Sequence, residues 1–143
     1  AAAEFLDEMG VPFEINALSA LSVPLSVAEF AQNAKERGIK VIIAGAGGAA
    51  HLPGVIAAFT TVPVIGIPIK SSNSIDGWDS ILSILQMHSG IPVATVAING
   101  AGNAALLAIQ ILAVEDKELA EKLDAKRKAD AESVLKKDAA LEI

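Results

Sequence analysis

Four short apolar runs, separated by more polar stretches, divide the chain and predict its strands. They cover residues 11–18, 39–46, 62–69 and 91–98. Two of them, "KVIIAGA" and "VPVIGIPI", are continuously apolar and rich in β-branched residues. That pattern is typical of parallel strands covered on both faces. We therefore expect a buried parallel sheet.

Helical patterns fill the spaces between the apolar runs. The predicted helices cover residues 1–9, 26–38, 52–59, 79–87, 103–114 and 115–138. Those at 79–87 and 103–114 are apolar on most sides, so both are expected to be buried. The last one holds seven of the eleven basic residues and is strongly amphipathic. It is expected to pack on the body of the domain or on a neighbouring subunit.

The alternation of strand and helix predicts one three-layer α/β domain with a parallel sheet over residues 1–143. Its beginning is unusual, because no predicted strand precedes the helix at 1–9. A doubly wound sheet usually begins with a strand that becomes central. Without that strand, two neighbouring strands keep open edges, which favour aggregation. Either the sequence is incomplete or another segment fills the gap.

Composition and charge narrow the function classes. The net charge of −6 and the lack of a basic stripe interleaved with aromatic residues argue against nucleic acid as a partner. The chain has no cysteine, which excludes disulfides and thiolate chemistry and fits a cytoplasmic protein. Two isolated histidines give no metal-ligand spacing, so no metal is expected. The longest apolar run, 104–114, is too short to span a membrane.

The most informative motif is "AGAGGAAHLPG", residues 44–54, between a predicted strand and a helix. Gly45, Gly47 and Gly48 allow a ligand to approach the backbone closely, and the helix start offers free N–H groups to an anion. The spacing loosely fits a dinucleotide fingerprint, but no acidic residue follows about 20 positions later. A tight turn that needs glycine only for packing is the alternative. His51 is either a substrate contact or a hydrogen-bonded capping or core residue.

A polar segment, "KSSNSIDGWDS" at 70–80, follows the third predicted strand. It lies at the carboxyl side of the sheet, where α/β proteins bind ligands. The residues from Ser71 to Ser74 could donate hydrogen bonds to a phosphate or ribose, and Ser74 or Asp76 could instead cap the next helix. Trp78 is expected to be a packing or interface anchor, and His88 an exposed residue at a helix end.

Three stretches resemble the PurE family: "VIIAGAGGAAHLPGVIAAFTTVPVIGIPI", "SIDGWDSILSILQM" and "IPVATVAINGAGNAALLAIQILA". The family contains N5-carboxyaminoimidazole ribonucleotide mutases and aminoimidazole ribonucleotide carboxylases of de novo purine synthesis. The resemblance extends over about residues 1–135. It implies a flavodoxin-like domain packed as a homo-octamer, an imidazole ribonucleotide as ligand, and no metal or organic cofactor. The implied reaction moves a carboxylate from the exocyclic nitrogen to the ring carbon, with a histidine that shuttles the proton.

The chain departs from that family at two places. The family's first strand and its Gly-Ser-x-Ser-Asp loop have no counterpart in this sequence. In the family's Ser-Ala-His-Arg-Thr-Pro turn, the histidine is replaced by Leu21, the arginine by Ser22 and the threonine by Val23. Leucine cannot carry a proton and serine supplies no fixed charge to a phosphate. We therefore expect catalysis to be impaired, and whether the chain is an enzyme stays open.

The resemblance implies substrate contacts that are still present, and the departures suggest a new surface. The candidate substrate-binding residues are Ser19, Ser22, Gly45, Gly47, Gly48 and His51. No catalytic residue is assigned, because the histidine position is Leu21. Leu21, Val23 and Leu25 instead form a candidate interface patch, since exposed apolar clusters commonly mark interfaces. The alternative function is therefore an engineered or repurposed scaffold that self-assembles through this patch. A relative that binds the ribonucleotide without catalysis is a third possibility.

Overall fold

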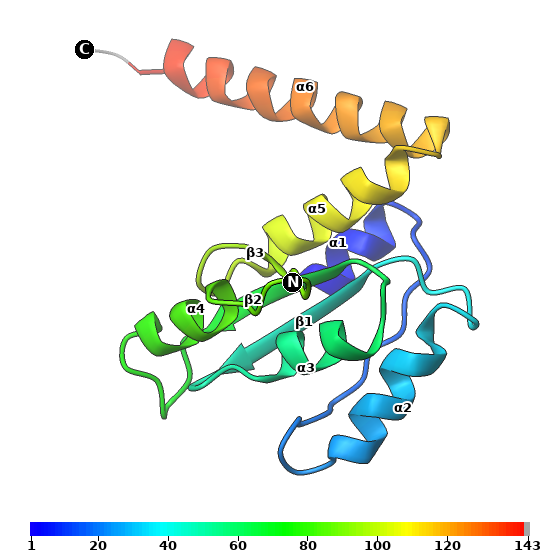
Figure 1. The fold of residues 1–143 in the computed structure, drawn as a ribbon. Coiled ribbons are helices and arrows are strands. Elements are labelled where there is room, and N and C mark those ends of the chain that lie inside the picture. The colour runs from blue at the N-terminus through cyan, green and yellow to red at the C-terminus, as the bar shows by residue number, and fades with distance from the viewer. Residues whose placement is uncertain (142–143) are drawn as a thin grey trace.

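The computed structural model describes residues 1–141 and contains a three-stranded parallel sheet in the order β1-β2-β3. The strands are β1 (Ile42–Gly47), β2 (Val64–Ile69) and β3 (Ala94–Thr95). Ile42 pairs with Val64 and Gly47 with Ile69 at the two ends of the first ladder, and Ile65 pairs with Ala94 in the second. The chain therefore has the predicted three-layer, flavodoxin-like α/β architecture, seen in Figure 1.

Six helices accompany the sheet in this part of the chain. Their bounds are α1 (Ala2–Glu8), α2 (Pro24–Ala34), α3 (Leu52–Phe59), α4 (Trp78–Leu85), α5 (Ala101–Ala113) and α6 (Lys117–Ala139). All six overlap the predicted helices, but α2 begins two residues earlier than predicted and ends at Ala34 rather than at residue 38. Among residues 1–141, no helix combines the length and the apolar character needed to cross a bilayer.

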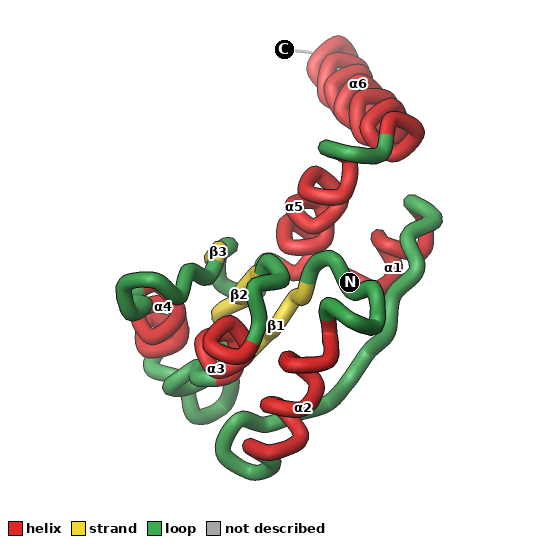
Figure 2. Tube along the Cα trace, turned by 45° about the vertical axis from the view of Figure 1, so that its right-hand side comes forward, coloured by secondary structure: helices red, strands yellow, loops and turns green. Residues whose placement is uncertain are grey.

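Alternate residues of the strands divide between two apolar clusters, one on each face of the sheet. Ile42, Ala44 and Val64 pack with Val27 and Ile56 from α2 and α3. On the other face, Ile65 and Ile67 pack with Ala104 and Ala108 of α5. Figure 2 shows the strands between these helical layers. Burial on both faces explains why the sequences of β1 and β2 are continuously apolar rather than alternating.

Two strand predictions need correction. Residues 11–18 are extended but form no strand, and no backbone hydrogen bond is found at residues 12–18. Figures 1 and 2 show this segment beyond the β1 edge of the sheet, and no strand lies between the segment and β1. Because a strand needs a ladder partner, the apolar pattern alone does not produce one here. The run at 91–98 shortens to β3, preceded by Pro92, which has no N–H to donate.

The burial expected of α4 is also partly wrong. Ser80 and Ile84 of α4 are buried, but Trp78, Leu82 and Leu85 are more than half exposed. These three residues and the preceding Ile75, which is also exposed, form an apolar strip that we call the α4 strip. Their spacing of four and three residues along α4 places them on one helix face, opposite the buried one. One face of α4 therefore has no partner in the described chain.

The helix α6 is attached to the body only at its beginning. The Asp116 side chain accepts a hydrogen bond from the Leu119 amide, which caps the helix, and Leu119 is buried. The Lys122 ammonium donates to the Met9 carbonyl, and the Lys126 ammonium lies 5.4 Å from the centre of the Phe5 ring. All residues from Arg127 to Ala140 are exposed, and Figure 1 shows the helix extending away from the sheet. The predicted strong amphipathic pattern is wrong, because Leu119 is the only buried residue of α6 and polar residues occupy all sides of the helix.

Candidate ligand site at the carboxyl end of the sheet

The glycine-rich segment crosses the end of β1 and leads into α3. Gly45 and Gly47 belong to β1, so the loop itself contains only residues 48–51. A Cβ on Gly45 would touch the Ile69 side chain at 3.4 Å. Gly45 was predicted as a substrate contact, and the structure places it within the strand and against the Ile69 side chain. This is an ordinary contact, so packing alone does not require a glycine at position 45.

Gly47 and Gly48 lie against the polar segment that follows β2. A Cβ on Gly47 would lie 2.4 Å from the Ser71 Oγ, and one on Gly48 would lie 2.9 Å from the Asn73 amide nitrogen. Gly48 also has a positive φ of +59°, which a residue with a Cβ adopts only at a cost. The predicted glycine-rich motif at 44–54 and the predicted polar segment at 70–80 therefore meet at the carboxyl end of the sheet.

Two serines of α4 form hydrogen bonds with the backbone of the glycine loop. The Ser80 hydroxyl lies 3.0 Å from the carbonyl oxygens of both Gly48 and Ile69, and its side chain is fully buried. The Ser83 hydroxyl accepts a hydrogen bond from the Ala50 amide at 3.1 Å and donates to the Asp79 carbonyl. Both serines were missed in the sequence. Their signal was weak: two polar residues three positions apart in an apolar helix.

His51 immediately precedes α3 and has an exposed side chain. It makes no capping hydrogen bond, so the predicted capping role is not seen. Its carbonyl accepts from Val55, which begins the helix, and Pro53 follows in the first turn. The imidazole therefore lies beside the glycine loop and is accessible to a ligand.

The segment between β2 and α4 is organised by hydrogen bonds of its own. The Asp79 carboxylate accepts from the Ser74 hydroxyl at 2.8 Å and from the Ile75 amide at 3.0 Å. These bonds, first the one from Ser74, lower the pKa of Asp79 below its ordinary value. The Ser74 hydroxyl also accepts from the Gly77 amide, although α4 has no side-chain cap at Gly77 itself. Asp76 pairs with Lys70 at 3.4 Å and caps nothing.

The predicted turn before α2 contains the remaining candidate residues. The Ser19 hydroxyl accepts from the Ser22 amide at 3.2 Å, and the Val23 amide bonds to the Ser19 carbonyl. Val23 occupies the N-cap position and makes no capping bond, as expected for valine. Glu14 and Arg37 form an ion pair that ties the preceding extended segment to the chain just after α2 and lowers the pKa of Glu14.

The apolar side chains of this turn and of the first turn of α2 are directed to solvent. Leu21 is 78% exposed, Leu25 is 84% exposed, and Val23 is also exposed. Figure 1 shows the turn at the same end of the domain as the loop after β1. In the described chain no hydrogen bond joins Ser19 or Ser22 to residues 45–51. The structure thus brings Gly47, Gly48 and His51 together, while Ser19 and Ser22 form a separate rim of the same end.

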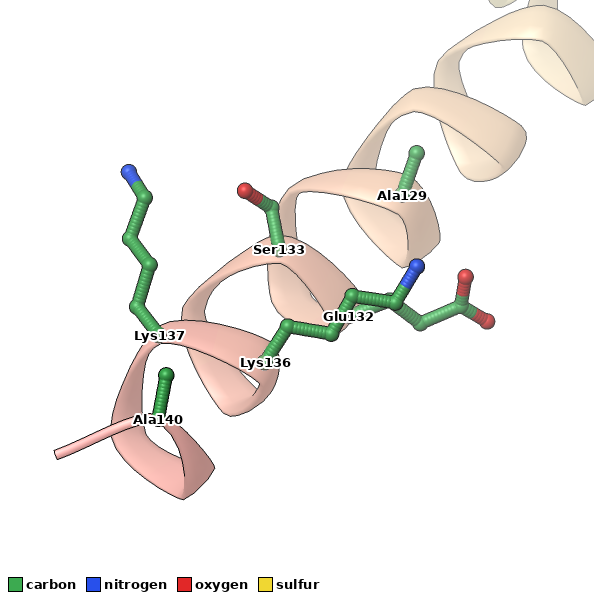
Figure 3. A pocket seen from close by; sticks show the side chains of 6 residues that line it. All are labelled: Ala129, Glu132, Ser133, Lys136, Lys137 and Ala140. Atoms are coloured by element: carbon green, nitrogen blue, oxygen red, sulfur yellow. The ribbon is translucent and has the colours of Figure 1, made fainter. Parts of the chain in front are cut away.

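The surface hollows at α6 and before the strands lie away from this end. The first is lined by Ala129, Glu132, Ser133, Lys136 and Lys137 of α6 and by Ala140 just after it, as Figure 3 shows. The second is lined by Lys35, residues 38–40 and residues 61–63, before the first two strands. No group of three or more histidine or acidic side chains within residues 1–141 is arranged to hold a metal ion. The glycine loop is therefore the best candidate site. The reason is its residues, the glycines, the exposed His51 and the start of α3, rather than a deep cavity.

Comparison with known proteins identifies close relatives. The family model described as AIR carboxylase matches residues 1–133. A protein of Pyrococcus horikoshii named N5-carboxyaminoimidazole ribonucleotide mutase is 59% identical over 134 residues, which are 90% of this chain and 75% of the relative. The mutases of Bacillus subtilis and Thermotoga maritima are 55% and 52% identical, over 94% and 99% of this chain and 83% and 82% of theirs.

A solved structure gives the same result for the fold. The crystal structure of Treponema denticola PurE superposes with a TM-score of 0.85 at 28% sequence identity. The match covers 99% of this chain and 88% of that one.

Proposed function

This chain belongs to the AIR carboxylase, or PurE, family, and from that premise we propose that it binds an imidazole ribonucleotide at the glycine loop but transfers the carboxylate slowly. The family reaction converts N5-carboxyaminoimidazole ribonucleotide to 4-carboxyaminoimidazole ribonucleotide in de novo purine biosynthesis. Relatives named for this reaction are 52–59% identical to the chain. Family membership therefore defines the chemistry, and the residues of this chain decide how much of it remains.

Retention of the ligand site is supported by the position of Gly47, Gly48 and His51 at the carboxyl end of the sheet, where α/β proteins bind ligands. A Cβ on either glycine would collide with Ser71 or Asn73, so both glycines are also needed for packing against the segment after β2. The exposed His51 and the start of α3 follow directly. Free N–H groups at a helix start favour an anion such as a phosphate. The proposed ligand contacts are therefore Gly47, Gly48 and His51, with Ser19 and Ser22 on the adjoining rim.

Loss of catalysis is supported by one observation in particular, the exposed leucine at position 21. By the resemblance, this position belongs to the proton-carrying histidine, and the neighbouring Ser22 to a phosphate-binding arginine. Loss of a proton carrier commonly costs about 10²–10⁴ in rate. Neither histidine of this chain belongs to that turn, since His51 precedes α3 and His88 follows α4. We propose no metal or organic cofactor for the reaction.

The same premise leads us to propose a homo-oligomer, with the family octamer as the expected form. Two features support it. The α4 strip exposes Ile75, Trp78, Leu82 and Leu85, and α6 beyond Lys126 has no contact that buries it. Helices in proteins depend on packing of one face for most of their stability. We therefore propose that α6 packs on a neighbouring subunit. A cytoplasmic location is proposed from the purine pathway alone.

A second candidate function is self-assembly through the patch of Leu21, Val23 and Leu25. The comparisons lend it no support, because the matched relatives are named as mutases. The observation in its favour is the exposure of two leucines and a valine in one turn. It is compatible with ribonucleotide binding, because the two surfaces use different residues.

The ligand proposal is tested by titration calorimetry with 5-aminoimidazole ribonucleotide. We expect saturable binding that Gly48→Val weakens, because a branched side chain would meet Asn73 and strain the backbone. Gly38→Val is the matched control, since Gly38 also has a positive φ but nothing lies within 4 Å of its added Cβ. Absence of heat at millimolar ligand would contradict the proposal.

A further inference from the structure

We infer that Ser80 and Ser83 of α4 are positioning residues that fix the orientation of two peptide groups in the glycine loop and so present Ala49 to the ligand. The inference rests on the proposed ligand site but concerns residues outside it. Neither serine faces the ligand side, because both hydroxyls bond to the loop or to α4 itself. Their effect on a ligand would be transmitted through the backbone.

The first peptide group joins Gly48 to Ala49. The Gly48 carbonyl points to the Ser80 hydroxyl, 3.0 Å away. In a trans peptide the carbonyl and the next N–H point in opposite directions, and the described chain has no cis peptide bond. The N–H of Ala49 therefore points away from α4. If the Gly48 carbonyl turned away from Ser80, that N–H would turn inward.

The second peptide group joins Ala49 to Ala50. The Ala50 N–H donates to the Ser83 hydroxyl at 3.1 Å, so the Ala49 carbonyl points away from α4 by the same rule. Both polar groups of Ala49 are thus directed to the side opposite the helix. The burial pattern agrees, because Gly48 and Ala50 are buried while Ala49 between them is exposed.

Ser80 also links the loop to the neighbouring strand. Its hydroxyl lies 3.0 Å from the Ile69 carbonyl as well, at the end of β2. A serine hydroxyl has one proton, so the two carbonyls share it. Ser80 is fully buried and is a polar residue in an otherwise apolar setting. A buried hydroxyl is retained at low cost only where its hydrogen bonds are made, and here they are made to the two segments of the proposed site.

The Ala49 groups define what the ligand must offer. An N–H and a carbonyl of one residue match a ligand that carries a hydrogen-bond acceptor beside a donor. An aminoimidazole bearing a carboxylate has this arrangement, with the carboxylate as acceptor and the amine as donor. The serine pair would therefore affect recognition of the reacting end of the ligand rather than of the phosphate.

The test combines amide exchange with ligand binding in Ser83→Ala, Ser83→Thr and Ser80→Ala. Ser83→Ala should accelerate exchange of the Ala50 amide about 3–10-fold, the equivalent of one typical hydrogen bond. Ser83→Thr keeps a hydroxyl and should restore the protection. Both alanine variants should weaken binding of 4-carboxy-5-aminoimidazole ribonucleotide about 3–10-fold, with a smaller effect on inorganic phosphate. Ser133→Ala, at an exposed serine of α6, is the control.

The outcomes separate the two proposals. Unchanged Ala50 exchange in Ser83→Ala would overturn the positioning role whatever the ligand data show. Equal weakening of ribonucleotide and phosphate binding in the two alanine variants, not restored in Ser83→Thr, would reduce the serines to a structural role and also overturn the inference. If the unaltered chain binds no ribonucleotide while the exchange results follow expectation, the proposed function fails and the serine–loop linkage stands.

Discussion

Gly47 at the end of β1 and Ser71 just after β2 are so close that a Cβ on Gly47 would lie 2.4 Å from the serine Oγ and 2.7 Å from its Cβ. The chain at the carboxyl ends of β1 and β2 therefore has no space for one more carbon atom at Gly47. Gly47→Ala should destabilise the fold by about 1–3 kcal/mol, as overpacking commonly does. Chemical denaturation measures the change in the free energy of unfolding.

The double variant Gly47→Ala/Ser71→Gly isolates this contact. It should recover part of the loss, because it removes both serine atoms that the new Cβ would meet. Gly102→Ala is the matched control: nothing lies within 4 Å of its Cβ, and the position is exposed in the first turn of α5. It should be neutral or stabilising by up to about 1 kcal/mol. An equal loss in the free energy of unfolding for Gly47→Ala and Gly102→Ala would contradict the close approach of Gly47 to Ser71.

Acid should loosen the segment before α4. Because hydrogen bonds lower the pKa of folded Asp79 below 3.8, its carboxylate contributes stability at neutral pH. That contribution is lost as the pH falls through the folded pKa. The NMR shift of the Ile75 amide, which donates to Asp79, should titrate with a midpoint below 3.8. Asp79→Asn should abolish this titration, and a midpoint at or above 3.8 would contradict the hydrogen-bonded carboxylate.

The α4 strip should determine the oligomeric state. Leu82→Asp places a charge on a side chain that is 59% exposed, so the monomer should keep its secondary structure and melting temperature. The molar mass of the oligomer, measured by light scattering, should fall to that of a smaller oligomer, because a buried unpaired charge is costly at an interface. Gln110→Glu, which adds a charge at an exposed site of α5, is the control. An unchanged mass for Leu82→Asp would contradict the role of the strip.

The turn before α2 gives a separate test of self-assembly. The variant Leu21→His/Ser22→Arg/Leu25→Asp replaces the two most exposed leucines of the turn with polar groups. If the apolar patch mediates contacts between copies, size-exclusion chromatography with light scattering should show a smaller assembly than for the unaltered chain. The Leu82→Asp result distinguishes this surface from the α4 strip. Identical assembly of the triple variant would eliminate the patch as an interface.

The comparison of sequence and structure shows what apolar patterning can predict. It located β1, β2 and all six helices, because burial on both faces leaves a continuous apolar run and burial on one face leaves a helical period. It failed at residues 11–18, where a strand-like run has no ladder partner. It also overestimated the burial of α4, because an apolar strip on a helix has the same sequence whether solvent, the same chain or another chain covers it.

The candidate site was predicted at the level of segments rather than of atoms. Glycine spacing and the strand order located the segments 44–54 and 70–80 at the carboxyl side of the sheet, but did not predict that Ser71 and Asn73 face Gly47 and Gly48. The roles of Ser80 and Ser83 depend on which helix face meets the loop, which residue types alone do not specify. Gly45 looked like a loop residue because the end of a strand has no distinct sequence signal.

The central claim is that the family fold is retained while its proton carrier is lost at Leu21. The most direct test is the rate at which this chain converts N5-carboxyaminoimidazole ribonucleotide to 4-carboxyaminoimidazole ribonucleotide, measured beside the Bacillus subtilis mutase under identical conditions. We predict a turnover number at least about 100-fold below that of the relative. A turnover number within about 10-fold of it, the span that lies below the usual effect of a lost proton carrier, would contradict the account.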